Sequence, residues 1–293
     1  SNHLRGSSMA TATTRRCGSC ASRHTCTLAG AVAFRREVPS VPPAKTVFKR
    51  KLPSGLVAFS SPAGRSFFMQ AMQSNEMEPF FPLSEQFTTQ EEPTYCALGT
   101  LTMCMNALGV DPHRRWRDAT GPGWRWWADE MFAPESSCLP SLEAVRRDGV
   151  SLRGFMQIAA ASGAAVEQHQ PRPAGRSTEE SFRASLTAAA ASADSFAVVN
   201  FCRAALGQTG SGHFSPIGGY HRASDSVLIL DVARFKYPPY WVPVSLLWEA
   251  VTAVDELSGS PRGWVTLEAA AEGEETAVPR PAGRSTEESF RAS

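Results

Sequence analysis

The sequence predicts an α+β fold, in which a helical part at about residues 46–195 precedes a mainly antiparallel β part at about residues 196–268. Two observations carry this prediction. Residues 97–108 place apolar side chains along one face at the period of a helix. Residues 226–233 form a β-branched apolar run, and residues 212–220 lead into it through a polar turn, which is typical of a β-hairpin. We therefore expect two lobes.

The composition limits the classes of partner. The chain has 293 residues, of which 42% are hydrophobic, enough for one sizeable globular domain or two small ones. Its formal net charge of +1 argues against a nucleic-acid partner, because such binding requires a basic surface. We expect no membrane partner, since no apolar run approaches the length of a membrane span. Seven cysteines at irregular spacing, in a chain too large to need disulfides, favour a reducing compartment.

Cys96 is predicted to begin the helix that the apolar run forms. Gly109 ends the pattern, and Pro93 favours an extended backbone just before Cys96. The unpaired N–H groups and the positive dipole end of a helix N-terminus favour a thiolate over a thiol. We therefore expect a lowered pKa at Cys96 and interpret this residue as a nucleophile. The alternative is a buried, inert cysteine, which is a common use of this residue type.

Gln90 is a candidate oxyanion donor, six residues before Cys96. Its side-chain amide can curl back beside the sulfur. Together with the backbone N–H of Cys96, the amide would supply two donors to the oxyanion of a tetrahedral intermediate, usually the largest single contribution to acyl-transfer catalysis. This interpretation requires a base elsewhere in the chain.

The predicted hairpin supplies a candidate base. The sequence contains six histidines: His3, His24, His113, His169, His213 and His221. A turn centred near residues 222–223 makes the numbers of facing residues sum to about 444–446, so that His213 lies opposite Asp231 or one pairing step from it. His221 falls in the turn and has no such partner. We predict that the Asp231 carboxylate holds the His213 imidazole in one tautomer.

Each of these residues also has a structural interpretation. Backbone hydrogen bonds alone would account for a strand histidine at His213, and a strand-end cap would account for Asp231. The order Cys96, His213, Asp231, with the cysteine on a helix and the other two on a hairpin, describes a papain-like arrangement of nucleophile, base and orienting carboxylate. We therefore predict a papain-like two-lobed fold with the active site between the helical lobe and the β lobe.

Four segments carry a closer resemblance. They are Glu92-Pro93-Thr94-Tyr95-Cys96, Trp124-Arg125-Trp126-Trp127, residues 208–221 (QTGSGHFSPIGGYH) and residues 230–239 (LDVARFKYPP). Over about residues 48–267 the chain resembles the phytochelatin synthase family, the glutathione γ-glutamylcysteinyltransferases. The resemblance implies four catalytic residues: Cys96 as nucleophile, His213 as general base and acid, Asp231 as orienting residue and Gln90 as oxyanion donor.

The resemblance implies a transpeptidation. Cys96 would attack the Cys-Gly carbonyl of glutathione, His213 would protonate the departing glycine, and the γ-Glu-Cys thioester would pass to a second glutathione or to a phytochelatin. Transfer to water instead would make the protein a peptidase of glutathione or its conjugates. The resemblance also implies stimulation by Cd²⁺ or Zn²⁺. We expect these thiophilic ions to act as metal–glutathione thiolate substrates and not at a metal site of the protein, because soft ions prefer thiolates.

Six residues near the catalytic ones are expected to bind substrate: Arg234, Lys236, Tyr237, Arg203, Tyr95 and Gly212. Arg234 and Lys236 follow Asp231 closely, and Arg203 precedes His213 by ten residues. Arg234 is our first choice for a substrate carboxylate, since its planar guanidinium pairs carboxylates bidentately. The structural alternative for Arg234 is an ion pair that holds the hairpin.

The chain departs from the family in three respects. Plant members carry a cysteine-rich second domain, whereas no cysteine follows Cys202 here. Residues 158–160 are apolar where plant members often have further cysteines, so we expect fewer auxiliary metal-binding thiols. Glu91 stands where plant members commonly have serine, and its carboxylate would either raise the pKa of Cys96 slightly or face solvent.

Residues 1–45 are expected to lie outside the catalytic domain at 46–268. Residues 1–8 look like a tag remnant. Residues 9–45 form a basic segment whose composition suits a plastid transit peptide or a disordered tail, since no acidic residue occurs as far as Arg36. We therefore expect the cytoplasm or the plastid as the location.

The same segment offers a function from a different class. Cys17, Cys20, His24 and Cys26 would make the chain a non-catalytic thiol protein that binds metal. A zinc site of this kind normally has a second ligand pair farther along the chain, and none follows here.

Residues 171–185 and 279–293 are identical, and both read PRPAGRSTEESFRAS. The first copy continues a helix-like pattern through Phe182 and Leu186, so we interpret it as the native one. The second copy lies in the segment 269–293, which we expect to be a disordered tail. A sharper hypothesis is that this copy docks in a neighbouring molecule where the first copy packs, which would give a homodimer.

Overall fold

The structure is a computed structural model that describes residues 50–116, 123–132, 139–171 and 177–271. These residues belong to one compact unit of the chain, which begins at Thr46. Three predictions lie outside the described residues: the transit-like N-terminal segment, the metal-binding set around Cys17, and the second copy of the repeat.

The described chain contains mostly helices in its first half and mostly strands in its second. The α-helices are α1 (Pro62–Gln73), α2 (Phe80–Glu85), α3 (Cys96–Ala107), α4 (Leu142–Asp148), α5 (Leu152–Ala161), α6 (Glu179–Ala190) and α7 (Val244–Thr252). Three 3-10 helices are η1 (Asp129–Phe132), η2 (Ala204–Leu206) and η3 (Arg222–Ser224). The strands are β1 (Val57–Ala58), β2 (Ala164–His169), β3 (Ser195–Cys202), β4 (Gly212–His221), β5 (Ser226–Ile229), β6 (Tyr240–Pro243), β7 (Val254–Asp255), β8 (Ser260–Pro261) and β9 (Gly263–Ala269). Within the described residues, no helix combines the length and apolar character needed to cross a bilayer.

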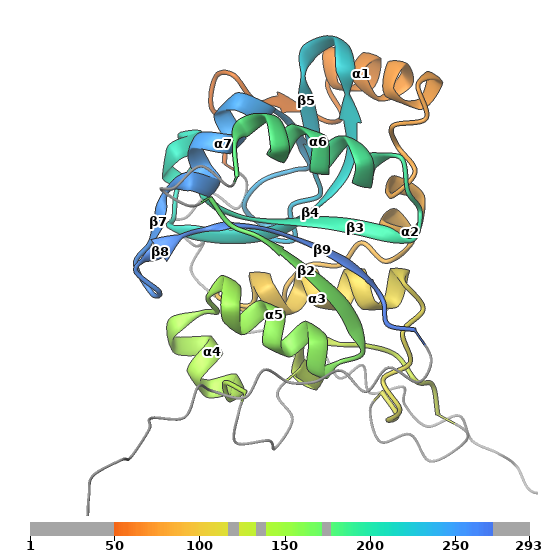
Figure 1. The fold of residues 1–293 in the computed structure, drawn as a ribbon, viewed down its shortest axis with the longest axis vertical. Coiled ribbons are helices and arrows are strands. Elements are labelled where there is room, and N and C mark those ends of the chain that lie inside the picture. The colour runs from red at the N-terminus through yellow and green to blue at the C-terminus, as the bar shows by residue number, and fades with distance from the viewer. Residues whose placement is uncertain (1–49, 117–122, 133–138, 172–176, 272–293) are drawn as a thin grey trace, which may run out of the picture. The chain divides into compact units, whose positions relative to one another are not determined.

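A seven-stranded antiparallel sheet, in the order β1-β6-β5-β4-β3-β9-β2, forms the centre of the described unit. Figure 1 shows α3, α4 and α5 on one side of the sheet and α6 and α7 on the other. The predicted α+β class is confirmed. The edge strands β1 and β2 both come from the part that was expected to be helical, so the two parts share one sheet.

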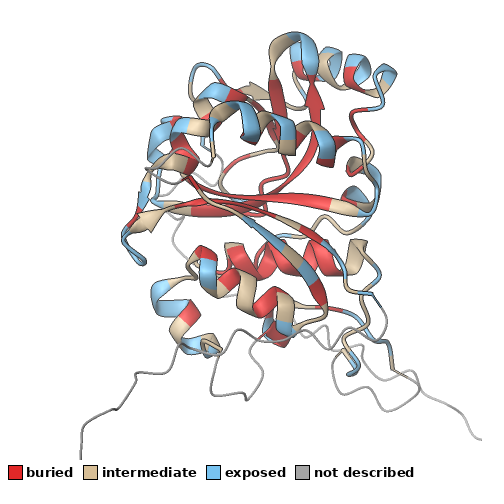
Figure 2. Cartoon of the chain, viewed as in Figure 1, coloured by how far each residue is buried: buried red, intermediate tan, exposed pale blue. Residues whose placement is uncertain are grey.

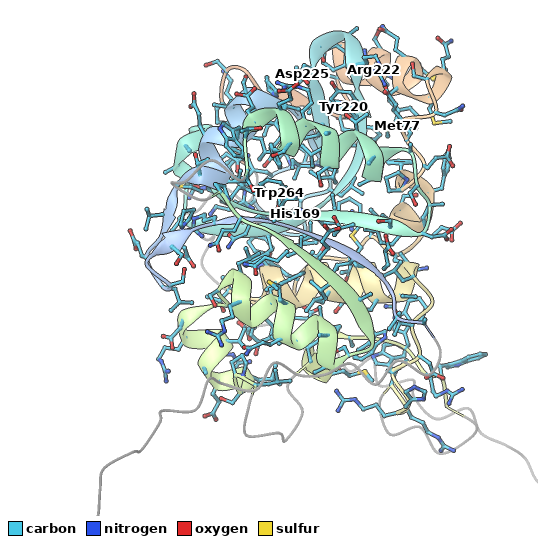
Figure 3. All side chains as sticks on the ribbon, viewed as in Figure 1. Met77, His169, Tyr220, Arg222, Asp225 and Trp264 are labelled. Atoms are coloured by element: carbon cyan, nitrogen blue, oxygen red, sulfur yellow. The ribbon has the colours of Figure 1, made fainter. Side chains whose placement is uncertain are left out.

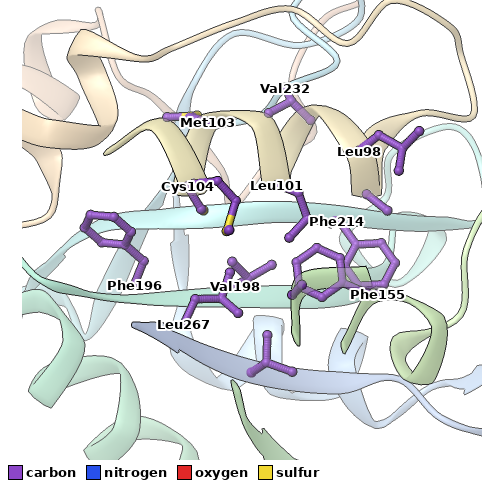
Figure 4. Close-up of a cluster of buried hydrophobic side chains, with 14 of the residues drawn as sticks. Leu98, Leu101, Met103, Cys104, Phe155, Phe196, Val198, Phe214, Val232 and Leu267 are labelled. Atoms are coloured by element: carbon purple, nitrogen blue, oxygen red, sulfur yellow. The ribbon is translucent and has the colours of Figure 1, made fainter. Parts of the chain in front are cut away.

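The predicted nucleophile helix is confirmed as α3. The helix begins at Cys96 and ends where Gly109 adopts a left-handed φ of 66°, a conformation that glycine adopts without strain. Its side chains are buried on nearly all sides, as expected for a helix packed inside a domain. Leu101 and Cys104 face the sheet beside Phe214 of β4 (Figure 4).

Side chains of the central strands alternate between two hydrophobic cores. Along β3, Phe196 and Val198 join the core under α3 and α5, whereas Val199 and Phe201 join the core under α6 and α7. Both faces of the sheet are therefore covered, and Figure 2 shows the central strands buried along most of their length. This double coverage explains why the strands carry apolar runs in place of a strict polar and apolar alternation.

The predicted hairpin is confirmed, with β4 and β5 joined by a turn at residues 222–225. Ladder pairing shifts at a bulge and ends at Ile217 and Ile229. Asp231 therefore lies two residues beyond the last pair, in the segment that follows β5. It approaches His213 from that segment and is not directly opposite it in the ladder.

The first copy of the repeat forms the beginning of α6, and the predicted helix through Phe182 and Leu186 is confirmed by the burial of both side chains. Thr178 and Ser181 form a capping box at its N-terminus. Arg183 pairs with Asp225 in the β4–β5 turn at 2.9 Å. Figure 3 labels Asp225 beside Tyr220, whose hydroxyl donates a hydrogen bond to the same carboxylate.

Candidate active site

Hydrogen bonds connect Cys96 to β4, the strand that carries His213. The half-buried Cys96 sulfur accepts hydrogen bonds from the backbone N–H groups of Phe214 and Ala97. Thr100, one turn further along α3, donates from Oγ1 to the carbonyl oxygen of Phe214 at 3.1 Å. Cys96 and Thr100 of α3 therefore contact the N–H and the carbonyl oxygen of Phe214, the residue that follows His213.

The predicted thiolate at Cys96 is wrong. Burial raises the pKa of the Cys96 thiol, and the hydrogen bonds from Phe214 and Ala97 and the charge of Arg203 offset this only in part. A sulfur removed from water loses the hydration that would stabilise its charged form, and here this loss outweighs the favourable helix terminus. Cys96 is thus a neutral thiol at neutral pH, and its attack on a carbonyl requires a base.

His213 and Asp231 meet as predicted. Nε2 of His213 lies 2.9 Å from Oδ1 of Asp231, and both side chains are almost completely buried. The same carboxylate accepts a hydrogen bond from the backbone N–H of Ala233 at 2.9 Å. This orientation leaves Nδ1 of His213 for a thiol proton. Within the described part of the chain, no hydrogen bond joins the ring to the Cys96 sulfur, a bond that often tightens only in complex with substrate.

Burial and the charge of Arg203 lower the pKa of His213 to about 4, although Asp231 pulls it upward. Burial raises the pKa of Asp231, but the charges of His213 and Arg203 more than compensate and bring it to about 2. At neutral pH the site therefore holds a thiol, a neutral imidazole and a carboxylate, which is a resting state suited to general-base catalysis.

Arg203, which we expected at the substrate, lies behind Asp231. Its side chain is 3% exposed, and Nη2 lies 2.9 Å from Oδ2 of Asp231 and 2.9 Å from Oδ1. Nη1 donates to the side-chain carbonyl of Gln208. The guanidinium also lies over the ring of Tyr237, 5.3 Å from its centroid.

Gln90 lies beside α3, and its amide is already engaged. Nε2 donates to the carbonyl oxygens of Glu92 at 2.7 Å and Pro93 at 2.9 Å. Its Oε1 is buried and has no hydrogen-bond partner among the described residues. The backbone of Gln90 approaches Gly99 so closely that a Cβ there would lie 3.1 Å from the Gln90 Cβ. The amide therefore holds the loop before Cys96 in the structure described.

Arg234 and Lys236 carry cationic groups that have no carboxylate within ion-pair distance among the described residues. The exposed Arg234 guanidinium lies over the ring of Phe87, 4.7 Å from its centroid. The ion pair that was the structural alternative for Arg234 is not formed within these residues. Burial and the charges of Arg203 and Arg50 lower the pKa of Lys236.

The remaining expected substrate residues have structural partners. Tyr95 is buried, and its hydroxyl donates to the carbonyl oxygen of Leu142 at 3.4 Å. Tyr237 is buried, and its hydroxyl accepts a hydrogen bond from the backbone N–H of Thr209 at 3.0 Å. Gly212 begins β4 and leaves room for the side chain of Arg262, the residue before β9.

Sequence reasoning missed Arg262. Its guanidinium occupies the space beside Gly212, where an added Cβ would collide with it. Nη2 lies 3.1 Å from Oδ1 of Asp255, Nη1 donates to Asn200 at 3.2 Å, and the buried Nε has no partner in the described part of the chain. Arg262 lies about fifty residues beyond His213 in the sequence, and only the pairing of β9, β3 and β4 brings the two together, so no local pattern could have revealed it.

Asp129 was missed for the same reason. Its buried carboxylate accepts hydrogen bonds from the hydroxyl of Thr102 in α3 at 2.7 Å and from the backbone N–H of Glu91 at 3.1 Å. Burial raises the pKa of Asp129, although these two hydrogen bonds lower it. Asp129 thus connects the nucleophile helix to the loop between Gln90 and Cys96.

Within the described ranges, no group of three or more His, Cys, Asp or Glu side chains is placed to hold a metal ion. Cys96, Cys104 and Cys202 are free thiols. Burial raises the pKa of Cys104 far above its ordinary value, so this second cysteine of α3 has little thiolate character.

A cysteine at the start of a buried helix, near a histidine held by a buried aspartate, is typical of enzymes that transfer acyl groups through a thioester. The family model described as phytochelatin synthase matches residues 47–264, and the chain belongs to that family. The resemblance that the sequence motifs indicated is confirmed.

Three curated relatives illustrate the similarity. The chain is 41% identical to glutathione gamma-glutamylcysteinyltransferase 3 of Lotus japonicus, over 82% of this chain and 45% of the relative. It is 40% identical to the glutathione gamma-glutamylcysteinyltransferase of Schizosaccharomyces pombe, over 76% of this chain and 51% of the relative. It is 42% identical to glutathione gamma-glutamylcysteinyltransferase 1 of Arabidopsis thaliana, over 76% of this chain and 44% of the relative. The aligned region thus spans about half the length of these relatives.

Proposed function

We propose that this chain is a glutathione γ-glutamylcysteinyltransferase that makes phytochelatins through a thioester on Cys96. The observation that carries the proposal is the buried pair of Asp231 and His213, next to the strand residue that hydrogen-bonds the Cys96 sulfur, in a chain of the phytochelatin synthase family. A nucleophile, a base and an orienting group are the parts that covalent acyl transfer needs. We propose a papain-like fold on the same grounds, since the nucleophile begins a helix and the base and carboxylate lie on a hairpin.

The first half-reaction cleaves glutathione. Nδ1 of His213 accepts the thiol proton as the Cys96 sulfur attacks the Cys-Gly carbonyl carbon, and the new C–S bond gives a tetrahedral oxyanion. When the C–N bond breaks, His213 returns the proton to the glycine amine, which leaves. Asp231 stabilises the imidazolium that forms between these two steps. The γ-Glu-Cys group remains on Cys96 as a thioester.

The oxyanion requires donors at the start of α3. The backbone N–H of Cys96 lies at the N-terminal end of the helix, where N–H groups lack helical partners. We propose Gln90 as the second donor. Because its Nε2 donates to the carbonyl oxygens of Glu92 and Pro93, this role requires the amide to exchange one of these carbonyls for the oxyanion.

Cationic side chains account for the choice of substrate. Glutathione carries two carboxylates, and Arg234 and Lys236 offer positive charge without a carboxylate partner among the described residues. We propose that these groups bind the substrate carboxylates, because charge-assisted hydrogen bonds from guanidinium groups are strong and directional.

In the second half-reaction, the amine of another glutathione or of a phytochelatin attacks the thioester. A new amide C–N bond forms, the C–S bond breaks, and the proton lost by the amine passes through His213 to the Cys96 sulfur. We propose that Cd²⁺ and Zn²⁺ stimulate this step as glutathione thiolate complexes, in which the metal masks the thiols and leaves the amine free. Water competes for the same thioester and would release γ-Glu-Cys.

Mass spectrometry of the products from millimolar-scale glutathione, with and without Cd²⁺, tests the proposal. We expect (γ-Glu-Cys)2-Gly, with γ-Glu-Cys as the product of competing hydrolysis. Detection of γ-Glu-Cys alone would instead identify a peptidase, and detection of neither product would exclude the enzyme assignment.

Two cysteine variants on one helix separate catalysis from metal binding. Cys96→Ser should abolish both products, whereas Cys104→Ala should keep them, because Cys104 is fully buried and far from thiolate character. Metal binding that survives in Cys96→Ser without any turnover in the unmodified protein would support the non-catalytic thiol protein instead.

The location and the assembly are separate proposals. We propose the cytoplasm or the plastid as the location, from the composition of residues 9–45. Imaging of a fluorescent fusion with and without this segment tests it. We propose a homodimer from the repeated segment at 279–293, and light scattering of the chain without residues 270–293 should then show a smaller species.

A further inference from the structure

We infer that Arg203 is a positioning residue, whose guanidinium fixes the Asp231 carboxylate and thereby orients His213. This inference assigns Arg203 a place behind the catalytic residues, where the sequence had indicated a substrate-binding group. It deepens the proposed function and rests on it for its kinetic test only.

The hydrogen bonds around Arg203 hold its guanidinium against the Asp231 carboxylate. The main chain around it is fixed, because its N–H donates to the carbonyl of Ser211 at 2.7 Å and its own carbonyl accepts from Gln208 at 2.9 Å. Nη2 lies 2.9 Å from both oxygens of Asp231. Nη1 donates to the Gln208 side chain. The guanidinium is thus held between Gln208 and the catalytic carboxylate.

Aromatic rings exclude other orientations. The guanidinium carbon lies 5.3 Å from the centroid of Tyr237 and 5.8 Å from that of Phe201, within the range of cation–π contacts. Phe201 also meets the His213 ring edge to face at 5.5 Å. With the residue 2% exposed, a substrate carboxylate has no surface of Arg203 to approach. By contrast, Arg234 is exposed and has no carboxylate partner in the described residues, so a substrate carboxylate can approach it.

Electrostatics explain why Asp231 needs this partner. A carboxylate with no exposed surface would take up a proton unless a cation compensated the loss of hydration. Ionisable groups that face this site are Arg203 behind Asp231, Lys236 after β5, Tyr237 and Tyr240 on the same side, and Cys96 on α3. Of these groups, Arg203 makes the direct contact with Asp231. Its charge lowers the pKa of Asp231 and of His213 together, which keeps the carboxylate ionised and the imidazole able to accept a proton.

Two substitutions separate the charge of Arg203 from its shape. Arg203→Met removes the cation, so the pKa of His213 should rise, and activity should be lost at a higher pH as the solution is acidified. Arg203→Lys keeps the charge but loses the second nitrogen, which donates to Gln208 and holds the group against Asp231. It should keep the acid limit near that of the unmodified protein while kcat falls. Arg183→Met is the matched control, because Arg183 pairs with Asp225 and Glu179 on α6 and the distant turn.

The test that does not depend on glutathione is alkylation of Cys96 by iodoacetamide, followed by peptide mass spectrometry across pH. We expect the acid limit of alkylation in Arg203→Met to move upward by on the order of one pH unit. In the control Arg183→Met, the acid limit of alkylation should not move. An unchanged acid limit in Arg203→Met would overturn the inference, even if the proposed glutathione reaction is correct.

Steady-state kinetics with glutathione provide the second readout. For a positioning residue, we expect Arg203→Met to lower kcat by at least about tenfold while KM changes by less than about twofold. A raised KM with unchanged kcat would return Arg203 to the substrate site and overturn the inference. If Arg203→Met does not fold, NMR titration of His213 in the unmodified protein decides, since a pKa near the ordinary value for histidine would contradict a neighbouring guanidinium.

Discussion

Burial governs the protonation of Cys96 and His213, the two residues that we propose to exchange a proton during catalysis. The Cys96 thiol has a raised pKa, and the His213 imidazole has a pKa lowered to about 4. Both groups are therefore uncharged at neutral pH, unlike the thiolate and imidazolium pair that a helix terminus alone would favour. In the proposed mechanism the proton moves only when the sulfur attacks, so the orientation of His213 matters more than the resting charge of Cys96.

The pH dependence of activity follows from His213. Above a pH of about 4 the imidazole is neutral and can accept the thiol proton, and below it the protonated ring cannot. We expect kcat/KM for glutathione to persist into acid solution and to fall as the pH drops through this value, measured over intervals short enough to keep the protein folded. An acid limit near the ordinary pKa of histidine would contradict the effect of burial and of Arg203.

Asp231→Asn should remove the charge that stabilises the imidazolium while preserving the shape of the side chain. We expect kcat to fall on the order of 10³-fold, since the substitution favours the wrong tautomer of His213. Arg203 would also remain buried without its anion, which should lower the free energy of unfolding by about 3–5 kcal/mol.

Asp225→Asn is the control, because Asp225 also pairs with an arginine but in a partly exposed turn. Asparagine tolerates the left-handed backbone of residue 225, which has a φ of 45°. We expect it to keep kcat and to lower the free energy of unfolding by about 1 kcal/mol or less. Equal losses in the two variants would argue against a special role for Asp231.

At the scale of elements, the loop before α3 is held from three sides. Gln90 donates to two carbonyls within the loop, Asp129 accepts the N–H of Glu91, and Arg146 of α4 pairs with Glu92 at 3.0 Å. The loop therefore presents the start of α3 in one conformation, which fixes the position of the backbone N–H of Cys96 as an oxyanion donor in the proposed mechanism.

Gly99→Ala tests this packing. A Cβ at Gly99 would lie 3.1 Å from the Cβ and 3.2 Å from the Cα of Gln90, so Gln90 must shift by a few tenths of an ångström. We expect kcat to fall on the order of 3- to 10-fold, because misplaced catalytic groups are costly. The higher helix propensity of alanine should offset part of the loss in stability.

Gly154→Ala in α5 is the matched control for that substitution. A Cβ at Gly154 would lie 3.0 Å from Val150, an equally close contact away from the loop before α3. We expect kcat to be unchanged and the shift in Tm to be similar. Loss of kcat in Gly154→Ala would show that general helix packing, and not the position of Gln90, explains the effect at Gly99.

For the molecule as a whole, the core under α3 and α5 supports the site. Phe155 of α5 stacks on Phe214 with ring centroids 4.8 Å apart, and the backbone of Phe214 contacts Cys96 and Thr100 (Figure 4). Packing between α5 and β4 therefore reaches Cys96 through one strand residue.

Phe155→Ala should lower the free energy of unfolding by about 3–5 kcal/mol, because a fully buried aromatic side chain leaves a cavity. Urea denaturation measures this change. Phe81→Ala, at a phenylalanine that is 45% exposed, should cost less than about 1 kcal/mol. A small loss at Phe155 would mean that the core collapses around the vacated space.

Local patterns were sufficient to predict α3, the hairpin of β4 and β5, and the approach of His213 to Asp231. Each depends on residues near in sequence, through the helical period, the turn and the register of one strand pair. The prediction for Arg203 was correct for its location and wrong for its partner. Its spacing before His213 correctly placed it near the site, but the choice between substrate and Asp231 as its partner depends on burial, which spacing does not contain.

The family, the α+β class and the three residues of the candidate site could all be predicted from the sequence, because motifs, periodicity and turn signals are local properties of the chain. The protonation of Cys96, the position of Arg203 behind Asp231 and the proximity of Arg262 to Gly212 became visible only in the folded chain. These outcomes depend on how much water each group loses and on which distant strands pair, and both are set only when the whole sheet is assembled.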